Sequence, residues 1–239
     1  MAEANLKSHI SNLISKYVII VAGGSGTRMG SSVPKQFLLA NGLPVLMHTM
    51  RAFHNSDVNT DIILVLHADF HAYWNELCTE HNFTIPHLLV AGGETRFHSV
   101  KNGLDKIQCT DDALIAVHDA VRPLTSAAII KTSYNHAREY GNAVTAVKSR
   151  DSVRQVIDGR SVSLLRDHIY LVQTPQTFRA GLLRKAYEQP FNPKFTDDAS
   201  VVEELGVGIQ LTAGDHENIK ITFPGDIAIA ELLLSKKGH

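Results

Sequence analysis

The sequence predicts an α/β protein with a doubly wound, Rossmann-like and mostly parallel sheet, into which a β-hairpin arm is inserted. Short β-branched apolar runs alternate along the chain with segments of helical periodicity, which is typical of such sheets. Small or charged residues directly follow several of these runs, where ligand-binding turns lie in parallel sheets. An Asp-Gly pair between two later β-prone runs predicts the arm. We expect one domain over residues 1–239, with the arm at 149–173.

The composition is that of an ordinary soluble globular protein. Of the 239 residues, 44% are apolar and 20% charged, and the net charge is −1 at pH 7. This balance predicts no nucleic-acid partner and no membrane surface, and the apolar run at Tyr17–Ala22 is too short to span a membrane. Cys78 and Cys109 form no Cys-x-x-Cys motif, so we expect a reducing, cytoplasmic location without a disulfide framework.

The first part of the chain contains the elements of the parallel sheet. Runs with the length of buried strands lie at 18–21, 62–66, 88–90, 114–117 and 143–147. Between them, apolar residues keep helical spacing within 46–53, 70–77, 100–107 and 129–137.

The pattern changes after residue 147. Residues 149–173 hold β-prone runs on both sides of Asp158-Gly159, a strong hairpin signal. The segment has few large core residues for its length, so we expect a partner to cover it. Helices are expected at 180–188 and 196–205, edge strands at 208–212 and 218–222, and an amphipathic helix at 224–234.

The strongest motif follows the first predicted strand. Ala22-Gly23-Gly24-Ser25-Gly26 has almost no side chains, so its backbone N–H groups can approach a ligand such as phosphate. Arg28 and Lys35 add positive charge nearby. The turn is also compatible with a plain strand-to-loop connection. It is not a Walker A loop, because no Lys-Ser/Thr pair closes it.

With Met29 and Pro34 included, this stretch resembles the nucleotidyltransferase signature Gly-x-Gly-Thr-Arg-Met…Pro-Lys. The resemblance implies an enzyme that joins a nucleoside triphosphate to a phosphorylated acceptor and releases pyrophosphate.

A second motif, Gly92–Ser99, follows the third predicted strand. Its small residues suit a pocket for a flat base, with Ser99 available to hydrogen-bond an edge of the base. The same residues are compatible with a capped helix start near Thr95.

A third motif, His118–Pro123, follows the fourth predicted strand. Asp119 is suited to hold Mg²⁺, a hard cation that prefers carboxylate and phosphate oxygens. The alternative is a plain surface ion pair between Asp119 and Arg122.

Three weaker motifs lie in the second half of the chain, at Thr174–Phe178, Thr196–Asp198 and Asn218–Thr222. The second is also compatible with a helix N-cap. In the third, strand alternation predicts that Asn218 and Lys220 share one face and the isoleucines the other. Lys220 would then be either a solvated surface lysine or a charge clamp beside a triphosphate.

In this order the motifs resemble one family, the 2-C-methyl-D-erythritol 4-phosphate cytidylyltransferases of the non-mevalonate isoprenoid pathway. The resemblance extends from about Tyr17 to Leu234 and departs at Lys148-Ser149, where a Pro-Val pair is expected. The matching stretches are Ala22–Met29 with Pro34-Lys35-Gln36, Gly92-Gly93 with Arg96 and Ser99, His118–Pro123, Arg166-Asp167, Thr174-Pro175-Gln176, Thr196–Ser200 and Glu217–Thr222.

The resemblance implies transfer of the cytidylyl group from CTP to methylerythritol phosphate, giving 4-diphosphocytidyl-2-C-methyl-D-erythritol and pyrophosphate. It implies catalytic roles for Arg28, Lys35 and Lys220, and Mg²⁺ binding by Asp119. The implied nucleotide contacts are Ala22, Gly23, Gly24, Ser25, Gly26, Gly93, Glu94, Ser99 and Ala120. The implied acceptor contacts are Arg122, Arg166, Thr174 and Thr196.

The arm predicts a homodimer, because an isolated hairpin is marginal in water and two arms can cover each other. By the resemblance, Arg166 would then reach the acceptor in the partner's site. Two alternatives stay open: a ribitol 5-phosphate cytidylyltransferase, which shares the glycine-rich loop, and a catalytically silent nucleotide-binding module.

Overall fold

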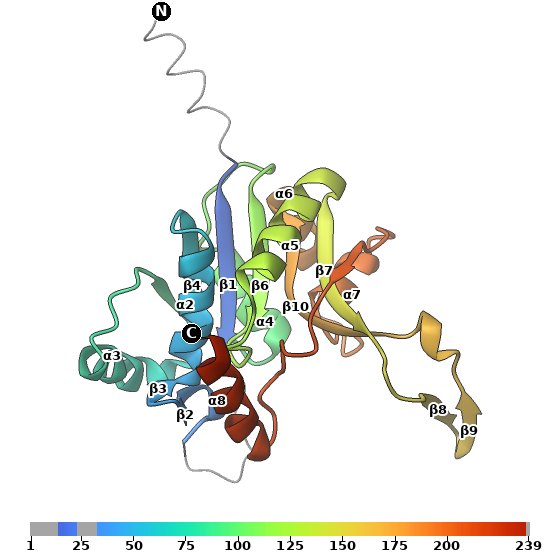
Figure 1. The fold of residues 1–239 in the computed structure, drawn as a ribbon. Coiled ribbons are helices and arrows are strands. Elements are labelled where there is room, and N and C mark those ends of the chain that lie inside the picture. Colours follow the sequence, from blue (N-terminus) through green and yellow to red (C-terminus); the bar gives the residue numbers. More distant parts are fainter. Residues whose placement is uncertain (1–13, 23–32, 238–239) are drawn as a thin grey trace, which may run out of the picture.

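The computed structural model describes residues 14–22 and 33–237, and its centre is a twisted sheet (Figure 1). Within these residues the sheet has seven strands, all parallel except β10, which runs antiparallel to both of its neighbours. In spatial order the strands are β11 (Leu211–Ala213), β7 (Asn142–Lys148), β10 (Tyr170–Arg179), β6 (Leu114–Asp119), β1 (Lys16–Ala22), β4 (Thr60–Leu66) and β5 (Leu88–Ala91). The predicted fold class and its five parallel strands are confirmed.

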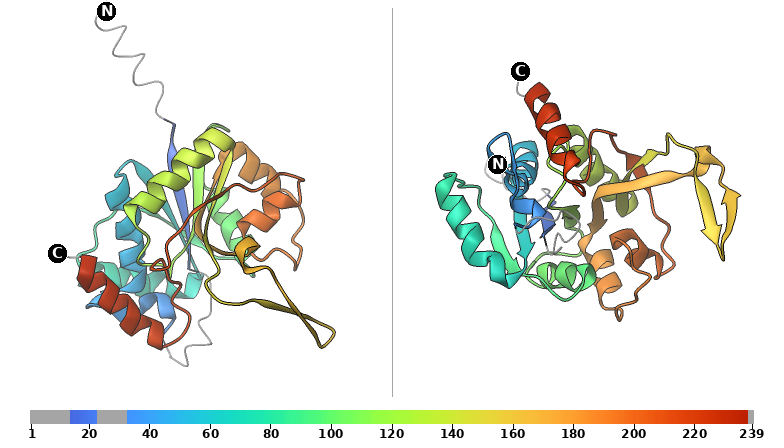
Figure 2. Two further views of the ribbon diagram at one scale, coloured as in Figure 1. Left: turned by 45° about the vertical axis from the view of Figure 1, so that its right-hand side comes forward. Right: turned by 90° about the horizontal axis from the view of Figure 1, so that it is seen from below.

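Helices cover both faces of the sheet because its central strands are apolar on both sides (Figure 2). In β1, Val18 and Ile20 pack into one core and Ile19 into the other. The first core also contains residues of α2 (Val45–Ser56), α3 (His71–Glu80) and α5 (Ala127–Tyr140). The second contains residues of α4 (Arg96–Leu104), α6 (Ala180–Tyr187) and α7 (Asp198–Glu203). The helices predicted from spacing are thus confirmed.

A third, smaller core joins the C-terminal helix α8 (Gly225–Lys237) to β2 (Leu39–Ala40), which pairs with β3 (Leu43–Pro44) in a short hairpin. The predicted helix is present, but it is only partly amphipathic: Ala230 is buried, whereas Ile229 and Leu232 are 49% and 59% exposed.

The predicted edge strand at 218–222 is wrong, since this segment is irregular, and the one at 208–212 is replaced by the shorter β11. The alternation of Asn218, Lys220 and Thr222 was misleading because Asn218 is fully buried, whereas Lys220 is exposed. The Ile221 N–H bonds the Val121 carbonyl in a loop, not in a strand ladder.

The predicted arm is confirmed as a hairpin of β8 (Arg154–Ile157) and β9 (Arg160–Ser163), which projects from the body (Figure 2). Its turn has positive φ at Asp158 (48°) and Gly159 (75°), as a two-residue hairpin turn requires. The return segment passes through the short 3-10 helix η4 (Arg166–His168) into β10, which already begins at Tyr170. No helix in the described part of the chain is long and apolar enough to cross a membrane.

Candidate active site

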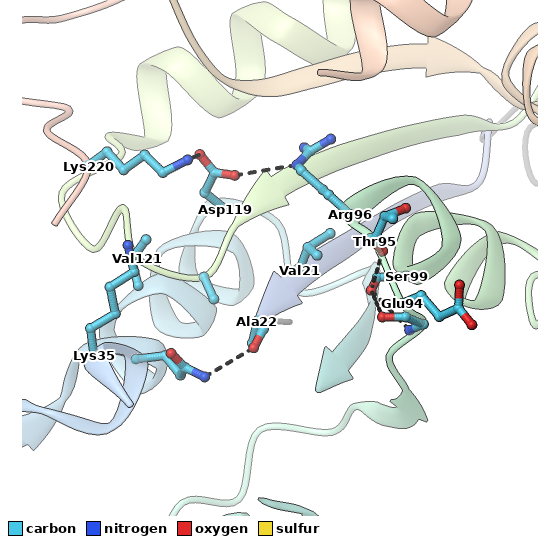
Figure 3. Close-up of a pocket in the computed structure, with 13 residues that line it drawn as sticks. Val21, Ala22, Lys35, Glu94, Thr95, Arg96, Ser99, Asp119, Val121 and Lys220 are labelled. Atoms are coloured by element: carbon cyan, nitrogen blue, oxygen red, sulfur yellow. Dashed lines mark hydrogen bonds and ion pairs between the residues drawn. The ribbon is translucent and has the colours of Figure 1, made fainter. Parts of the chain in front are cut away.

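A pocket of about 220 Å³ lies where parallel strands β1 and β6 end and where the chain turns from β5 into α4. The carboxyl ends of these strands meet at one edge of the sheet, so motifs far apart in sequence converge there. Of the residues predicted from sequence, the pocket is lined by Ala22, Lys35, Gly93, Glu94, Ser99, Asp119, Ala120 and Lys220 (Figure 3).

One wall of this pocket is the tightly folded entry into α4. The Thr95 side chain caps the helix by accepting from the His98 N–H, so the capped-start interpretation is confirmed. The Ser99 hydroxyl accepts from the Gly93 N–H at 3.1 Å and donates to the Thr95 carbonyl at 2.9 Å. A Cβ at Gly93 would lie 2.5 Å from the His98 Cβ, so only glycine allows this approach. Ser99 thus shapes the wall, and its predicted contact with the base stays a prediction.

The opposite wall is built around the buried carboxylate of Asp119. Lys220 Nζ lies 3.1 Å from its Oδ2, and Arg96 Nε lies 3.9 Å from its Oδ1 (Figure 3). Arg122 Nε lies 3.3 Å from Oδ2 as well. Burial alone would raise the pKa of Asp119, but the positive charges of Arg96, Lys220 and Arg122 outweigh it and hold that pKa well below its usual range. Asp119 and Arg122 are only 8% and 7% exposed, so the alternative of a surface ion pair is wrong.

Arg96 is a site residue that the sequence reasoning did not assign. Its guanidinium binds Asp198 through two hydrogen bonds of 2.9 Å and 2.6 Å, and the Tyr187 hydroxyl donates to the same carboxylate at 2.6 Å. The charge of Asp198 outweighs burial and raises the pKa of Arg96. Its place directly after the Gly-rich turn that follows β5 is a signal that could have identified it.

A second pocket, of about 310 Å³, adjoins the first and shares Arg96, Asp119 and Lys220 with it. The predicted acceptor residues that line it are Arg122, Thr174 and Thr196. The Thr174 hydroxyl accepts from the Asp119 N–H at 3.1 Å, which ties β10 to the end of β6. The N-cap alternative for Thr196–Asp198 is also confirmed, because Asp197 caps α7 while Thr196 faces the pocket.

The remaining predicted residues lie elsewhere. Gly23, Gly24, Ser25, Gly26 and Arg28 fall outside the described residues. Arg166 lies on η4 of the exposed arm, where its Nη1 donates to the Arg150 carbonyl at 3.3 Å. It is not among the described residues that line the two pockets.

Comparison with known proteins identifies the family. Residues 16–236 match the model of the IspD family, 2-C-methyl-D-erythritol 4-phosphate cytidylyltransferase. Proteins of that name from Bacteroides thetaiotaomicron and Porphyromonas gingivalis are 49% and 47% identical to this chain, with 91% and 92% of the chain and 98% of each relative covered.

Solved structures agree with the sequence comparisons. The 4-diphosphocytidyl-2C-methyl-D-erythritol synthase of Anaerococcus prevotii superimposes with a TM-score of 0.78 at 29% identity, covering 92% of this chain and 95% of that one. The Francisella tularensis 2-C-methyl-D-erythritol 4-phosphate cytidylyltransferase gives 0.77 at 32% identity, covering 92% and 99%. The chain therefore belongs to the 2-C-methyl-D-erythritol 4-phosphate cytidylyltransferase family.

Proposed function

We propose that this enzyme transfers the cytidylyl group of CTP to 2-C-methyl-D-erythritol 4-phosphate, releasing pyrophosphate, in isoprenoid precursor biosynthesis. The observation that carries the proposal is the pair of adjoining pockets with Arg96, Asp119 and Lys220 between them. One pocket has a wall of small residues suited to a nucleotide, and the other is lined by Arg122 and two threonines suited to a phosphorylated acceptor. Cationic groups at the boundary suit a reaction between two anions.

The acceptor phosphate attacks the α-phosphorus of CTP in line, and pyrophosphate leaves. The attacking oxygen is already ionised, so no general base is needed, and catalysis depends on positioning and charge neutralisation. Both Lys35, which begins a short 3-10 helix (Lys35–Phe37), and Lys220, in the irregular segment 218–222, line the first pocket. Together with Arg28 they neutralise charge on the phosphates. Arg122, Thr174 and Thr196 orient the acceptor.

Mg²⁺ fits this site, with Asp119 and substrate phosphates as its ligands. The carboxylate stays ionised because its pKa is held low, and within the described residues its Oδ1 is paired only with Arg96 Nε, at 3.9 Å. No group of three metal-binding side chains gathers in that part of the chain, which suits an ion that takes its other ligands from phosphate. Bound there, Mg²⁺ supplies charge neutralisation. EDTA should abolish turnover and added Mg²⁺ restore it; full activity in EDTA would contradict this.

The arm supports a homodimer with shared sites. Three apolar side chains of the arm are largely exposed to water: Val156 (66%), Val162 (60%) and Leu165 (66%). An isolated hairpin is marginally stable in water, and an exposed apolar patch is typical of an interaction surface. Two arms packed together would bury them. Arg166, carried on the same arm, would then contact the acceptor in the partner's site. Cys78 and Cys109 are free thiols, which supports a reducing, cytoplasmic location.

The experiment that tests the activity is a pyrophosphate-release assay with CTP and each of two acceptors, methylerythritol phosphate and ribitol 5-phosphate. We expect release with the first acceptor and little with the second. Preferred use of ribitol 5-phosphate would support the other cytidylyltransferase, and no release with either would support a silent nucleotide-binding module.

A further inference from the structure

Asn218 is a fully buried polar residue behind the second pocket, which its partners Arg122, Gln173 and Thr174 line. Its Oδ1 accepts from the Thr125 hydroxyl at 2.7 Å. Its Nδ2 donates to the Thr174 carbonyl at 3.0 Å and to the Gln173 Oε1 at 3.1 Å. Its backbone carbonyl accepts from Arg122 Nη1 at 2.7 Å. One side chain thus bonds two segments that are distant in sequence from it and from each other.

These partners belong to the elements that form the site. Thr125 and Arg122 lie in the loop after β6, and the Arg122 side chain reaches both Asp119 and the Asn218 carbonyl. Thr174 lies in β10, and its hydroxyl holds the Asp119 backbone N–H. Asn218 therefore fixes the loop and the strand that carry two of the proposed acceptor contacts.

Asn218 also fixes the segment that carries Lys220. This segment is irregular, so no strand ladder sets its position. Its inward anchors are Asn218 and Ile221, both 0% exposed, and the lysine between them is held against Asp119 at 3.1 Å. A shift of the anchor would move the Lys220 ammonium relative to Asp119.

The chemistry at position 218 requires an amide. Two of its partners, the Thr174 carbonyl and Gln173 Oε1, only accept, whereas the Thr125 hydroxyl donates. Aspartate would place an acceptor against acceptors, and leucine would remove the hydrogen bonds to all three of these buried partners. Either change costs more than the loss of one hydrogen bond, because the stranded partners stay buried.

We propose that Asn218 is a positioning residue for the transfer reaction, which holds Lys220, Arg122 and Thr174 in register around Asp119. This inference rests on the proposed function. Asn218 does not touch the reacting atoms; it acts through the residues that do.

The test is a kinetic comparison of Asn218→Asp with the wild-type enzyme, normalised to folded protein by circular dichroism. Displacement of the charge contacts should lower kcat/KM for methylerythritol phosphate by roughly 10²-fold. Lys220 also lines the first pocket, so CTP binding should weaken as well; the Gly93 wall is untouched, so the preference for CTP over UTP should stay within about twofold of wild type. If Asn218 had only a structural role, Asn218→Asp would lower thermal stability but leave the kinetic constants of the folded enzyme unchanged.

Ser133→Ala is the matched control, because it also removes a buried side-chain hydrogen bond, the 2.6 Å contact with Thr177. It should lower Tm while leaving the kinetic constants of the folded enzyme unchanged. If folded Asn218→Asp keeps wild-type constants for both substrates, the inference is overturned.

A second pair of variants decides the matter if Asn218→Asp does not fold. Thr125→Val removes the hydrogen bond donated to Asn218, whereas Thr125→Ser retains the hydroxyl. The inference predicts reduced kcat/KM for the acceptor in the valine variant and near-normal values in the serine variant. Equal activity of the two would overturn it. A wild-type enzyme that transfers nothing from CTP would overturn the proposed function and this inference together.

Discussion

Lys220 Nζ lies 3.1 Å from the Oδ2 of Asp119 and joins an irregular C-terminal segment to the end of a central strand. The lysine side chain is 43% exposed, but the carboxylate that it contacts is buried. The pair lines both pockets, so the ammonium can face phosphate groups from either substrate. This placement favours the charge-clamp interpretation of Lys220 over that of a solvated surface lysine.

Lys35→Ala should give a folded but nearly inactive enzyme. Lys35 lines the first pocket, the proposed nucleotide site, and donates to the Ile221 carbonyl at 3.1 Å. Loss of one transition-state charge contact typically lowers turnover by roughly 10²–10³-fold. Steady-state pyrophosphate release measures the effect. Lys131→Ala, on the exposed face of α5, is the control and should match wild type. Near-normal turnover of Lys35→Ala would remove that residue from the mechanism.

CTP should be used in strong preference to UTP and ATP. The first pocket, of about 220 Å³, is lined by Gly93, Glu94 and Ser99, and we expect it to be too tight for a purine. A site that accepts from the exocyclic amine of cytosine would face the carbonyl of uracil with unpaired acceptors. Competing nucleotides in one assay measure the preference. Equal use of UTP or ATP would contradict the cytidylyl assignment.

Arg166 and Lys35 variants should complement each other if the dimer shares its sites. Arg166→Ala and Lys35→Ala homodimers should each be weak. After subunit exchange, about half of the dimers are mixed, and each mixed dimer has one intact site, so activity should recover towards about a quarter of wild type. Differently tagged subunits verify the exchange. No recovery after verified exchange would place the action of Arg166 in its own chain, and a monomer in solution would exclude the shared site.

His118 should make the folded state less stable in mild acid. Burial lowers its pKa to about 3, although Asp119 opposes this shift while Arg122 and Arg96 reinforce it. An unfolded histidine titrates near a pH of about 6.5, so between these values the unfolded chain binds more protons. The free energy of unfolding should therefore fall as the pH is lowered from about 6.5 towards 3, by at most about 1.4 kcal/mol per pH unit for this group.

Urea unfolding at a series of pH values measures this dependence. His118→Gln should show a shallower slope than wild type, because its side chain cannot titrate. His216→Gln, at an exposed position, is the control for the replacement of a histidine by glutamine. An unchanged slope in His118→Gln would mean that other groups cause the acid sensitivity.

The parts of the fold that the sequence predicted are those encoded locally. The β-branched runs specified the parallel strands, and Asp158-Gly159 specified the turn of the arm, because its backbone geometry demands such residues. The motifs that follow β1, β5 and β6 predicted the place of the first pocket, because parallel topology brings strand ends together.

The parts that the sequence left unassigned depend on long-range contacts. β10 carries polar residues such as Gln173 and Gln176 where it enters the sheet, so it lacks the pattern of a central strand. Arg96 owes its place to Asp198, which lies far along the chain. Asn218 looks like a surface residue in an alternating segment, and only its partners in β10 and the loop after β6 explain its burial.

The most direct test of the account follows the oxygen atoms during transfer. Methylerythritol phosphate labelled with ¹⁸O in its phosphate is incubated with CTP and the enzyme, and the products are analysed by ³¹P NMR and mass spectrometry. If the acceptor phosphate attacks the α-phosphorus of CTP, the new diphosphate linkage contains ¹⁸O and the released pyrophosphate contains none. Label in the pyrophosphate, an unlabelled linkage, or no diphosphocytidyl product would contradict the central claim.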